Sequence, residues 1–118
     1  MEIWELVAPR KIKVSPVVAI GDTVKAVTLT DDAQGMLQVL NMVVPTLTGG
    51  VTATLTIEDD AALVLYNSGA KGTGTTTFVN DPATFKNIPI IKGAVVRITL
   101  SGTQAGAITV ALSLFVKA

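Results

Sequence analysis

The chain of 118 residues contains no cysteine and no histidine. Without cysteine it can have no disulfide framework, no thiolate zinc site and no thiol nucleophile. Without histidine it lacks the commonest general base, the commonest transition-metal ligand and the base of a serine–histidine–aspartate triad. These two absences predict a protein that is not an enzyme and that holds no cofactor and no metal.

Charged and aromatic residues are also scarce, at 15% and 4% of the chain. Nine basic residues balance nine acidic ones, so no excess of positive charge is available to neutralise the phosphates of a nucleic acid. One tryptophan and one tyrosine offer little surface on which a sugar ring could stack. A surface with so little net charge repels copies of itself weakly, which favours a homo-oligomer or docking onto a larger body.

The beginning of the chain, MEIWEL, carries acidic residues where a secretory signal would carry basic ones. No apolar run in the sequence approaches the roughly 20 residues that span a bilayer as a helix. We therefore expect a protein that is made in the cytoplasm and that has no membrane partner.

Residues 51–66 are the clearest structural signal in the chain. Val51, Ala53, Leu55 and Ile57 alternate with three threonines and Glu58, which is the period of a strand with one buried face. Charged residues at 58–60 interrupt the alternation, and a second apolar run follows at 62–66. The pattern predicts a β-hairpin that turns at residues 59–61.

The rest of the chain repeats this pattern of short apolar runs between turn residues. Pro16 within the first run predicts an edge strand or a bulge. Regularly spaced short strands without a convincing helix predict an all-β fold, a single antiparallel β-sandwich of about eight strands, either jelly-roll or Ig-like. The sandwich is expected to cover residues 12–118, with residues 1–11 as an N-terminal arm. The further strands are predicted at residues 12–20, 23–30, 36–44, 75–79, 94–100 and 107–116.

Residues 36–44 fit two templates. The spacing of Leu37, Leu40 and Val44 is helical, whereas Leu37, Val39 and Val43 would share one face of a strand. The run is short and is bracketed by a glycine and a proline, and β-branched residues gather at its end. We therefore predict a strand.

The arm carries the only tryptophan, Trp4, together with Leu6 and, at its end, Arg10. One interpretation is a first strand or a tail that covers one end of the sandwich. The other is an extended arm that reaches a neighbouring subunit and places Trp4 in a pocket, because a large aromatic side chain is a good interface anchor. Trp4, Leu6 and Arg10 are therefore interface candidates.

Two further basic residues are interface candidates. Lys71 falls in residues 67–74, whose glycines superficially resemble a phosphate-binding loop but stand in the wrong order for one. We expect a mobile loop that is exposed for contacts. Arg97 lies in the middle of a predicted strand, where it either faces solvent or pairs with a carboxylate of a neighbouring subunit. The acidic pairs at 31–32 and 59–60 lack the ligand spacing of a calcium loop and suit ordinary turns.

Four segments carry a resemblance to a known class of proteins: VTATLTIED (51–59), LYNSGA (65–70), VRITLSG (96–102) and ITVALSLFV (108–116). With them, residues 37–117 resemble small β-sandwich proteins that are encoded among the structural genes of tailed phages. The resemblance implies a virion component, most plausibly a capsid decoration (cement) protein that binds the major capsid protein. Such proteins are small and cofactor-free and are commonly trimers. The N-terminal arm lies outside the resemblance.

The sequence therefore supports two hypotheses. The first is a non-enzymatic virion protein that stabilises a capsid by docking at the joints between capsomers. The alternative is a β-sandwich binding module for a glycan or a receptor, which would use the predicted loops at 67–74 and 101–107.

Overall fold

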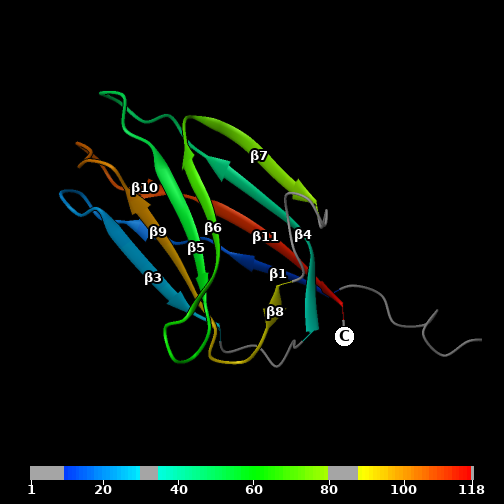
Figure 1. Ribbon diagram of the computed structural model, residues 1–118. Coiled ribbons are helices and arrows are strands. Elements are labelled where there is room, and N and C mark those ends of the chain that lie inside the picture. The colour runs from blue at the N-terminus through cyan, green and yellow to red at the C-terminus, as the bar shows by residue number, and fades with distance from the viewer. Residues whose placement is uncertain (1–9, 30–34, 80–87, 118) are drawn as a thin grey trace, which may run out of the picture.

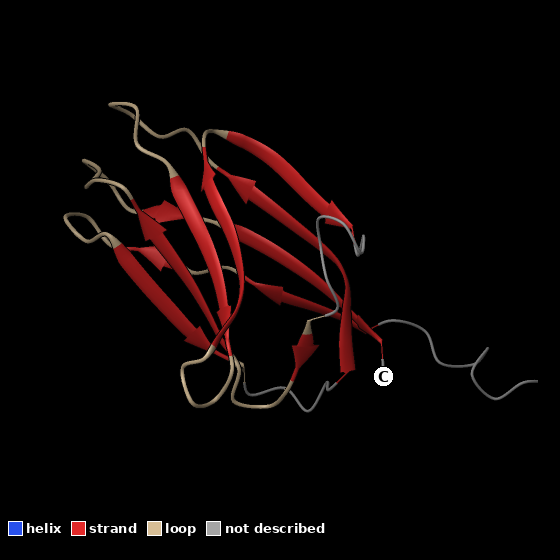
Figure 2. Ribbon diagram, viewed as in Figure 1, coloured by secondary structure: helices blue, strands red, loops and turns tan. Residues whose placement is uncertain are grey.

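The computed structural model describes residues 10–29, 35–79 and 88–117 (Figure 1). These ranges form strands and loops without a helix, so none of them contains a helix that could cross a membrane. Figure 2 shows the strands in two facing layers. The predicted all-β antiparallel sandwich is confirmed.

One layer is a five-stranded sheet and the other a four-stranded sheet. The first has the order β1 (Arg10–Val14), β11 (Ala111–Lys117), β4 (Gly35–Val44) and β7 (Gly74–Val79), and β8 (Pro89–Ile90) pairs with the beginning of β4. The second has the order β3 (Val24–Thr28), β9 (Val95–Leu100), β5 (Ala53–Glu58) and β6 (Val64–Lys71). A short pair, β2 (Val17–Val18) with β10 (Ile108–Thr109), leads from one layer to the other.

Strands that precede the hairpin predicted at residues 51–66 pair with strands that follow it, in reverse order along the chain. β5 pairs with β6, β4 with β7, β3 with β9, β2 with β10 and β1 with β11. The chain is thus one long antiparallel ribbon that doubles back at the β5–β6 turn and is then rolled into two sheets. This winding is that of a jelly roll, not of an immunoglobulin sandwich.

The core lies between the two sheets and is almost entirely aliphatic. In β5, Ala53, Leu55 and Ile57 are fully buried while the threonines between them are half-exposed, as the alternation predicted. The same alternation holds in β9 and β11. The largest fully buried side chains are Leu37, Leu40, Met42, Leu55, Ile57, Ile90, Ile98, Leu112, Leu114, Val18 and Val96.

The strand β4 confirms the prediction at 36–44, but its buried face differs from the predicted one. Phe115 pairs with Val39 whereas Val116 pairs with Leu37, so Gln38 is an extra residue in β4. Such a bulge shifts the alternation by one position. Leu37 is buried as predicted, but Val39 and Val43 are not, and the other buried residues of β4 are Leu40, Met42 and Val44. The bulge also explains why the apolar spacing resembled a helix.

The first predicted strand is broken at the position of its proline. β1 ends at Val14 and β2 begins at Val17, with Pro16 between them accepting a hydrogen bond from the amide of Val110. β1 is an edge strand, as the proline predicted. β1 begins at Arg10, so the last two residues of the segment predicted as an arm belong to the sheet.

The predicted loop at 67–74 is wrong over most of its length. β6 continues to Lys71 and β7 begins at Gly74, which leaves only two linking residues. The turn-forming residues there make a bulge in β6, where the Ser68 hydroxyl accepts a hydrogen bond from the Leu55 amide and Gly69 has a φ of 72°. Residues 101–107 do form a loop, between β9 and β10.

Candidate functional site

The outer face of the four-stranded sheet is broad and carries little charge. Residues that lie opposite one another on neighbouring strands share one face of a sheet. This face contains short aliphatic and threonine side chains around one arginine and one glutamate. Val24 and Val64 are 44% and 53% exposed on its two edge strands. Its members are Val24, Ala26, Thr28, Thr54, Thr56, Glu58, Val64, Asn67, Ala70, Val95, Arg97 and Thr99.

The two charges on this face form one ion pair. Arg97 Nε donates a hydrogen bond to Glu58 Oε2 at 2.8 Å, and the Thr56 hydroxyl lies 3.5 Å from the same oxygen. The Glu58 side chain is 8% exposed and that of Arg97 is 39% exposed. The hydrogen bond from Arg97 lowers the pKa of Glu58 against the opposing effect of burial, and the same bond raises the pKa of Arg97.

The pair gives Arg97 a carboxylate partner within its own chain. The residue does face outward, and its carboxylate partner is Glu58 of the same chain. Sequence alternation placed both residues on outward faces of their strands. Their contact depends on β5 and β9 being neighbours across 39 residues, which is a property of the topology.

The turn between β5 and β6 is held by Asp59. Its Oδ1 accepts hydrogen bonds from the amides of Ala61 and Leu63, both at 2.8 Å, and its own amide donates to the Leu63 carbonyl. Ala62 has a φ of 66°, which is in the left-handed region. The carboxylate is thus occupied by the turn. Within the described part of the chain, no group of three or more potential ligands could hold a metal ion.

Gln104 lies in loop 101–107, and no sequence pattern marked it as a structural residue. Its side chain is buried, and Oε1 accepts hydrogen bonds from the amide and the hydroxyl of Thr48 at 2.9 and 3.1 Å. Nε2 donates to the carbonyls of Thr48 and Thr103. The glutamine therefore joins this loop to the loop that precedes β5.

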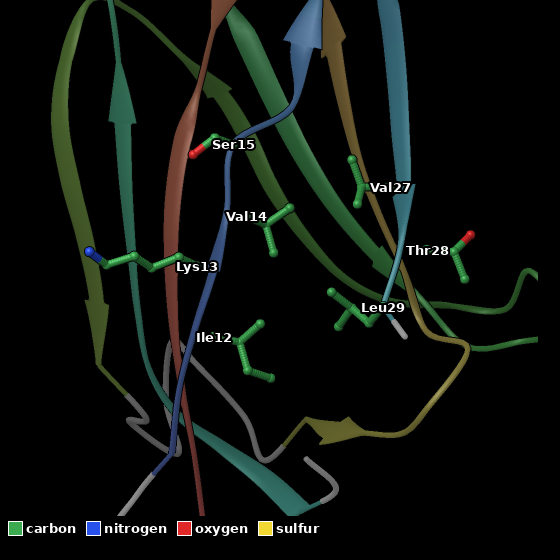
Figure 3. Close-up of a pocket in the computed structure, with 7 residues that line it drawn as sticks. All are labelled: Ile12, Lys13, Val14, Ser15, Val27, Thr28 and Leu29. Carbon is green, nitrogen blue, oxygen red and sulfur yellow. The ribbon is translucent and has the colours of Figure 1, made fainter. Parts of the chain in front are cut away.

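A groove opens between the two edge strands β1 and β3, one from each sheet. It has a volume of about 380 Å³. Figure 3 shows Ile12 and Val14 on one side and Val27 and Leu29 on the other, with Lys13 pointing away from them. The residues that line the groove are Ile12, Lys13, Val14, Ser15, Val27, Thr28 and Leu29.

The strands that border this groove are basic. Arg10, Lys11 and Lys13 lie on β1 and Lys25 lies on β3, and neither strand contains an acidic residue. Lys11 Nζ lies 5.6 Å from the centre of the Phe115 ring, within reach of a cation–π contact. A chain with no net charge therefore has a locally positive edge.

The structure does not bring the predicted interface candidates together. Trp4 and Leu6 lie outside the described residues. Arg10 is exposed at the edge of the five-stranded sheet, whereas Lys71 and Arg97 lie in the other sheet, Lys71 half-buried at the end of its edge strand β6. The sequence did not predict the groove between β1 and β3, because its two sides come from strands of different sheets.

Comparison with known protein families finds no match, and a search of curated proteins also finds none. Among the solved structures that match this chain are three with TM-scores of 0.37 to 0.46. A chain of tomato aspermy virus matches with a TM-score of 0.46 at 8% identity, over 91% of this chain and 76% of that one. The Yersinia pseudotuberculosis-derived mitogen matches with a TM-score of 0.45 at 9% identity, over 92% and 86%.

The third, dimeric latent PorU from Porphyromonas gingivalis, has a TM-score of 0.37 at 7% identity. The match covers 94% of this chain but only 13% of the PorU chain. At these scores and identities, none of the three matches shows a function for this chain.

Proposed function

We propose that this chain is a non-enzymatic structural subunit of a virus particle. In this proposal it is a capsid decoration protein that docks on the major capsid protein as a homo-oligomer, with a trimer favoured. The proposal joins the resemblance of residues 37–117 to phage virion proteins with the jelly-roll winding, an architecture that viral capsid domains share with lectins and cupins.

The observation that carries the proposal is the outer face of the four-stranded sheet. The centres of protein interfaces are depleted of charged residues. On this face the only two charges neutralise one another, and the surrounding threonine, valine and alanine side chains are short. Such a face can approach a partner closely without leaving a charge buried and unpaired, which suits attachment to a large protein surface.

Heat resistance of virus particles tests the docking role. Particles of the virus that carries this gene should lose their contents at a lower temperature when assembled without the protein, and adding the purified protein should restore the resistance. Release of the genome can be followed with a nucleic-acid dye. Particles that bind the protein with no gain in heat resistance, or that do not bind it at all, would contradict the proposal.

The second candidate is a binding module that uses loop 101–107, which lies at one end of the sandwich and whose residues are mostly exposed. The other loop of that hypothesis, 67–74, is mostly strand. Tyr66 and Phe115 are half-buried, so neither gives an open platform for a sugar ring. Binding to a glycan array that is lost when residues 101–107 are shortened would favour this candidate over docking on a capsid.

A further inference from the structure

We propose that residues 1–8 of a second copy of this chain dock as an added strand in the groove between β1 and β3. The inference rests on the proposed homo-oligomer and names the contact that forms it.

The groove offers what an added strand needs. Among the described residues, β1 pairs only with β11 and β3 only with β9, so the side of each strand that borders the groove has no strand partner. A peptide that adds to such an edge gains main-chain hydrogen bonds, and pockets for alternate side chains give specificity. Ile12, Val14 and Leu29 are 5–8% exposed and supply an apolar floor.

The N-terminal segment is complementary to this groove in charge. Residues 1–8 contain Glu2 and Glu5 and no basic residue, whereas β1 and β3 carry four basic residues and no acidic one. In an extended strand Trp4 and Leu6 share one face, which matches the apolar floor. The volume of the groove, about 380 Å³, is in the range of pockets that bury a large aromatic group.

The positions of the two glutamates suit an extended strand. Residues 2 and 5 point to opposite faces of a strand because the side-chain period is two. The two lysines of the receptor strands, Lys13 and Lys25, also differ in the side of their strand on which they lie. Lys13 points away from the groove (Figure 3), whereas Lys25 shares the side of β3 that carries Val27 and Leu29. An added strand can therefore place one glutamate near Lys13 and the other near Lys25.

Pro9 favours a second copy over the chain's own segment as the occupant. Arg10 is already paired with Val116, so for a tight hairpin beside β1 the segment of the same chain would have to reverse direction at residues 8 and 9. A type I′ turn there would need a positive φ at Pro9, which proline cannot adopt, and a type II′ turn would need one at Ala8, where it is unfavourable. A segment that continues in the direction of β1 instead leads away from its own groove.

Tryptophan fluorescence gives a direct readout because Trp4 is the only tryptophan in the chain. Dilution of the full-length protein should shift the emission maximum from shorter to longer wavelength as Trp4 leaves the groove. Light scattering over the same concentrations should show the mass falling in parallel. Both changes should share one midpoint.

Charge reversal identifies the receptor. The double variant Lys13→Glu/Lys25→Glu should raise the concentration at the midpoint about tenfold or more, since it replaces two attractions by repulsions. Glu2→Lys/Glu5→Lys should do the same, and combining all four changes should restore assembly. Lys71→Glu, on the opposite edge of the four-stranded sheet, is the matched control and should leave the midpoint unchanged.

Three results would overturn the inference. A blue-shifted emission that does not depend on concentration would assign the groove to the chain's own segment. Emission typical of exposed tryptophan at every concentration would mean that Trp4 does not enter the groove. Assembly that ignores both charge reversals would place the contact elsewhere. None of these results bears on docking to a capsid, which the heat-resistance experiment measures separately, so this inference can fail while docking stands.

Discussion

Arg97 and Glu58 are two charged residues on a face that otherwise carries little charge, and their ion pair neutralises both. Glu58 is nearly covered, and its carboxylate depends on the hydrogen bond from Arg97 at 2.8 Å. Removing one partner of such a pair leaves a charge without compensation, which costs more than the pair itself contributes. Because Arg97 is partly exposed, water and salt weaken the interaction relative to one in the core.

Replacement of Arg97 by methionine keeps the aliphatic stem and removes the cation. We expect Arg97→Met to lower the free energy of unfolding by about 1–2 kcal/mol, because Glu58 remains covered and charged. Urea denaturation at neutral pH measures the loss. The double variant with Glu58→Gln should recover part of it, and a double variant that is less stable than Arg97→Met would contradict this explanation.

The same pair predicts a dependence of stability on pH. Arg97 holds the pKa of Glu58 below its ordinary value of 4.5, so the folded protein binds this proton more weakly than the unfolded chain. The stabilisation is complete above the ordinary pKa and is lost as the pH falls through the lowered one. At neutral pH the wild type should have a higher free energy of unfolding than Glu58→Gln, and below pH 4.5 this difference should disappear. Urea denaturation across this range measures it. A difference that does not change with pH would rule out the pair as its source.

At the scale of elements, the β5–β6 turn is where the long antiparallel ribbon reverses. Asp59 holds it with two side-chain hydrogen bonds, and Ala62 adopts a φ of 66° that is unfavourable for any residue with a Cβ atom. The turn is therefore stabilised by the side chain of Asp59 and strained at Ala62.

Replacement of Ala62 by glycine should remove this strain. We expect Ala62→Gly to raise the free energy of unfolding by about 0.5–1 kcal/mol, since glycine adopts positive φ at no steric cost. Its neighbour Ala61 does not have a positive φ, so Ala61→Gly is the matched control and should lower stability by a similar amount through chain entropy. Thermal unfolding of the two variants measures both effects, and two changes of the same sign would refute the argument.

At the scale of the whole molecule, the rolled ribbon presents one sheet face with little charge and one edge that is basic. We propose different partners for the two, the capsid for the face and a second copy for the edge. The two contacts share β3 but can be separated by mutation because they use opposite sides of it, with Val24 and Ala26 on the face and Val27 and Leu29 toward the groove.

The double variant Val24→Lys/Val64→Lys adds two charges to the outer face of the four-stranded sheet without touching the core. We expect it to fold normally and to lose binding to capsids at least about tenfold, because a partner that covers the face would have to desolvate both added charges without pairing them. Val17 is 45% exposed on β2, so Val17→Lys is a control of equal exposure that should bind normally. Co-sedimentation with capsids measures both, and equal binding by all three proteins would exclude this face.

The strands and their buried faces follow from the local pattern wherever the alternation is unbroken, as in β5, β9 and β11. Alternation fails at bulges, because one extra residue reverses the faces beyond it. It therefore misassigned the buried face of β4, and the glycine and serine that form the bulge in β6 were interpreted as a loop.

The sequence by itself determined that the protein is an all-β sandwich with its central hairpin at residues 51–66. Side-chain period and turn residues are properties of neighbouring positions in the chain. Only the tertiary structure decided that the winding is a jelly roll, that Arg97 pairs with Glu58 across 39 residues, and that β1 and β3 border a groove. These features depend on which distant strands pack side by side, and that depends on the burial of all apolar faces at once.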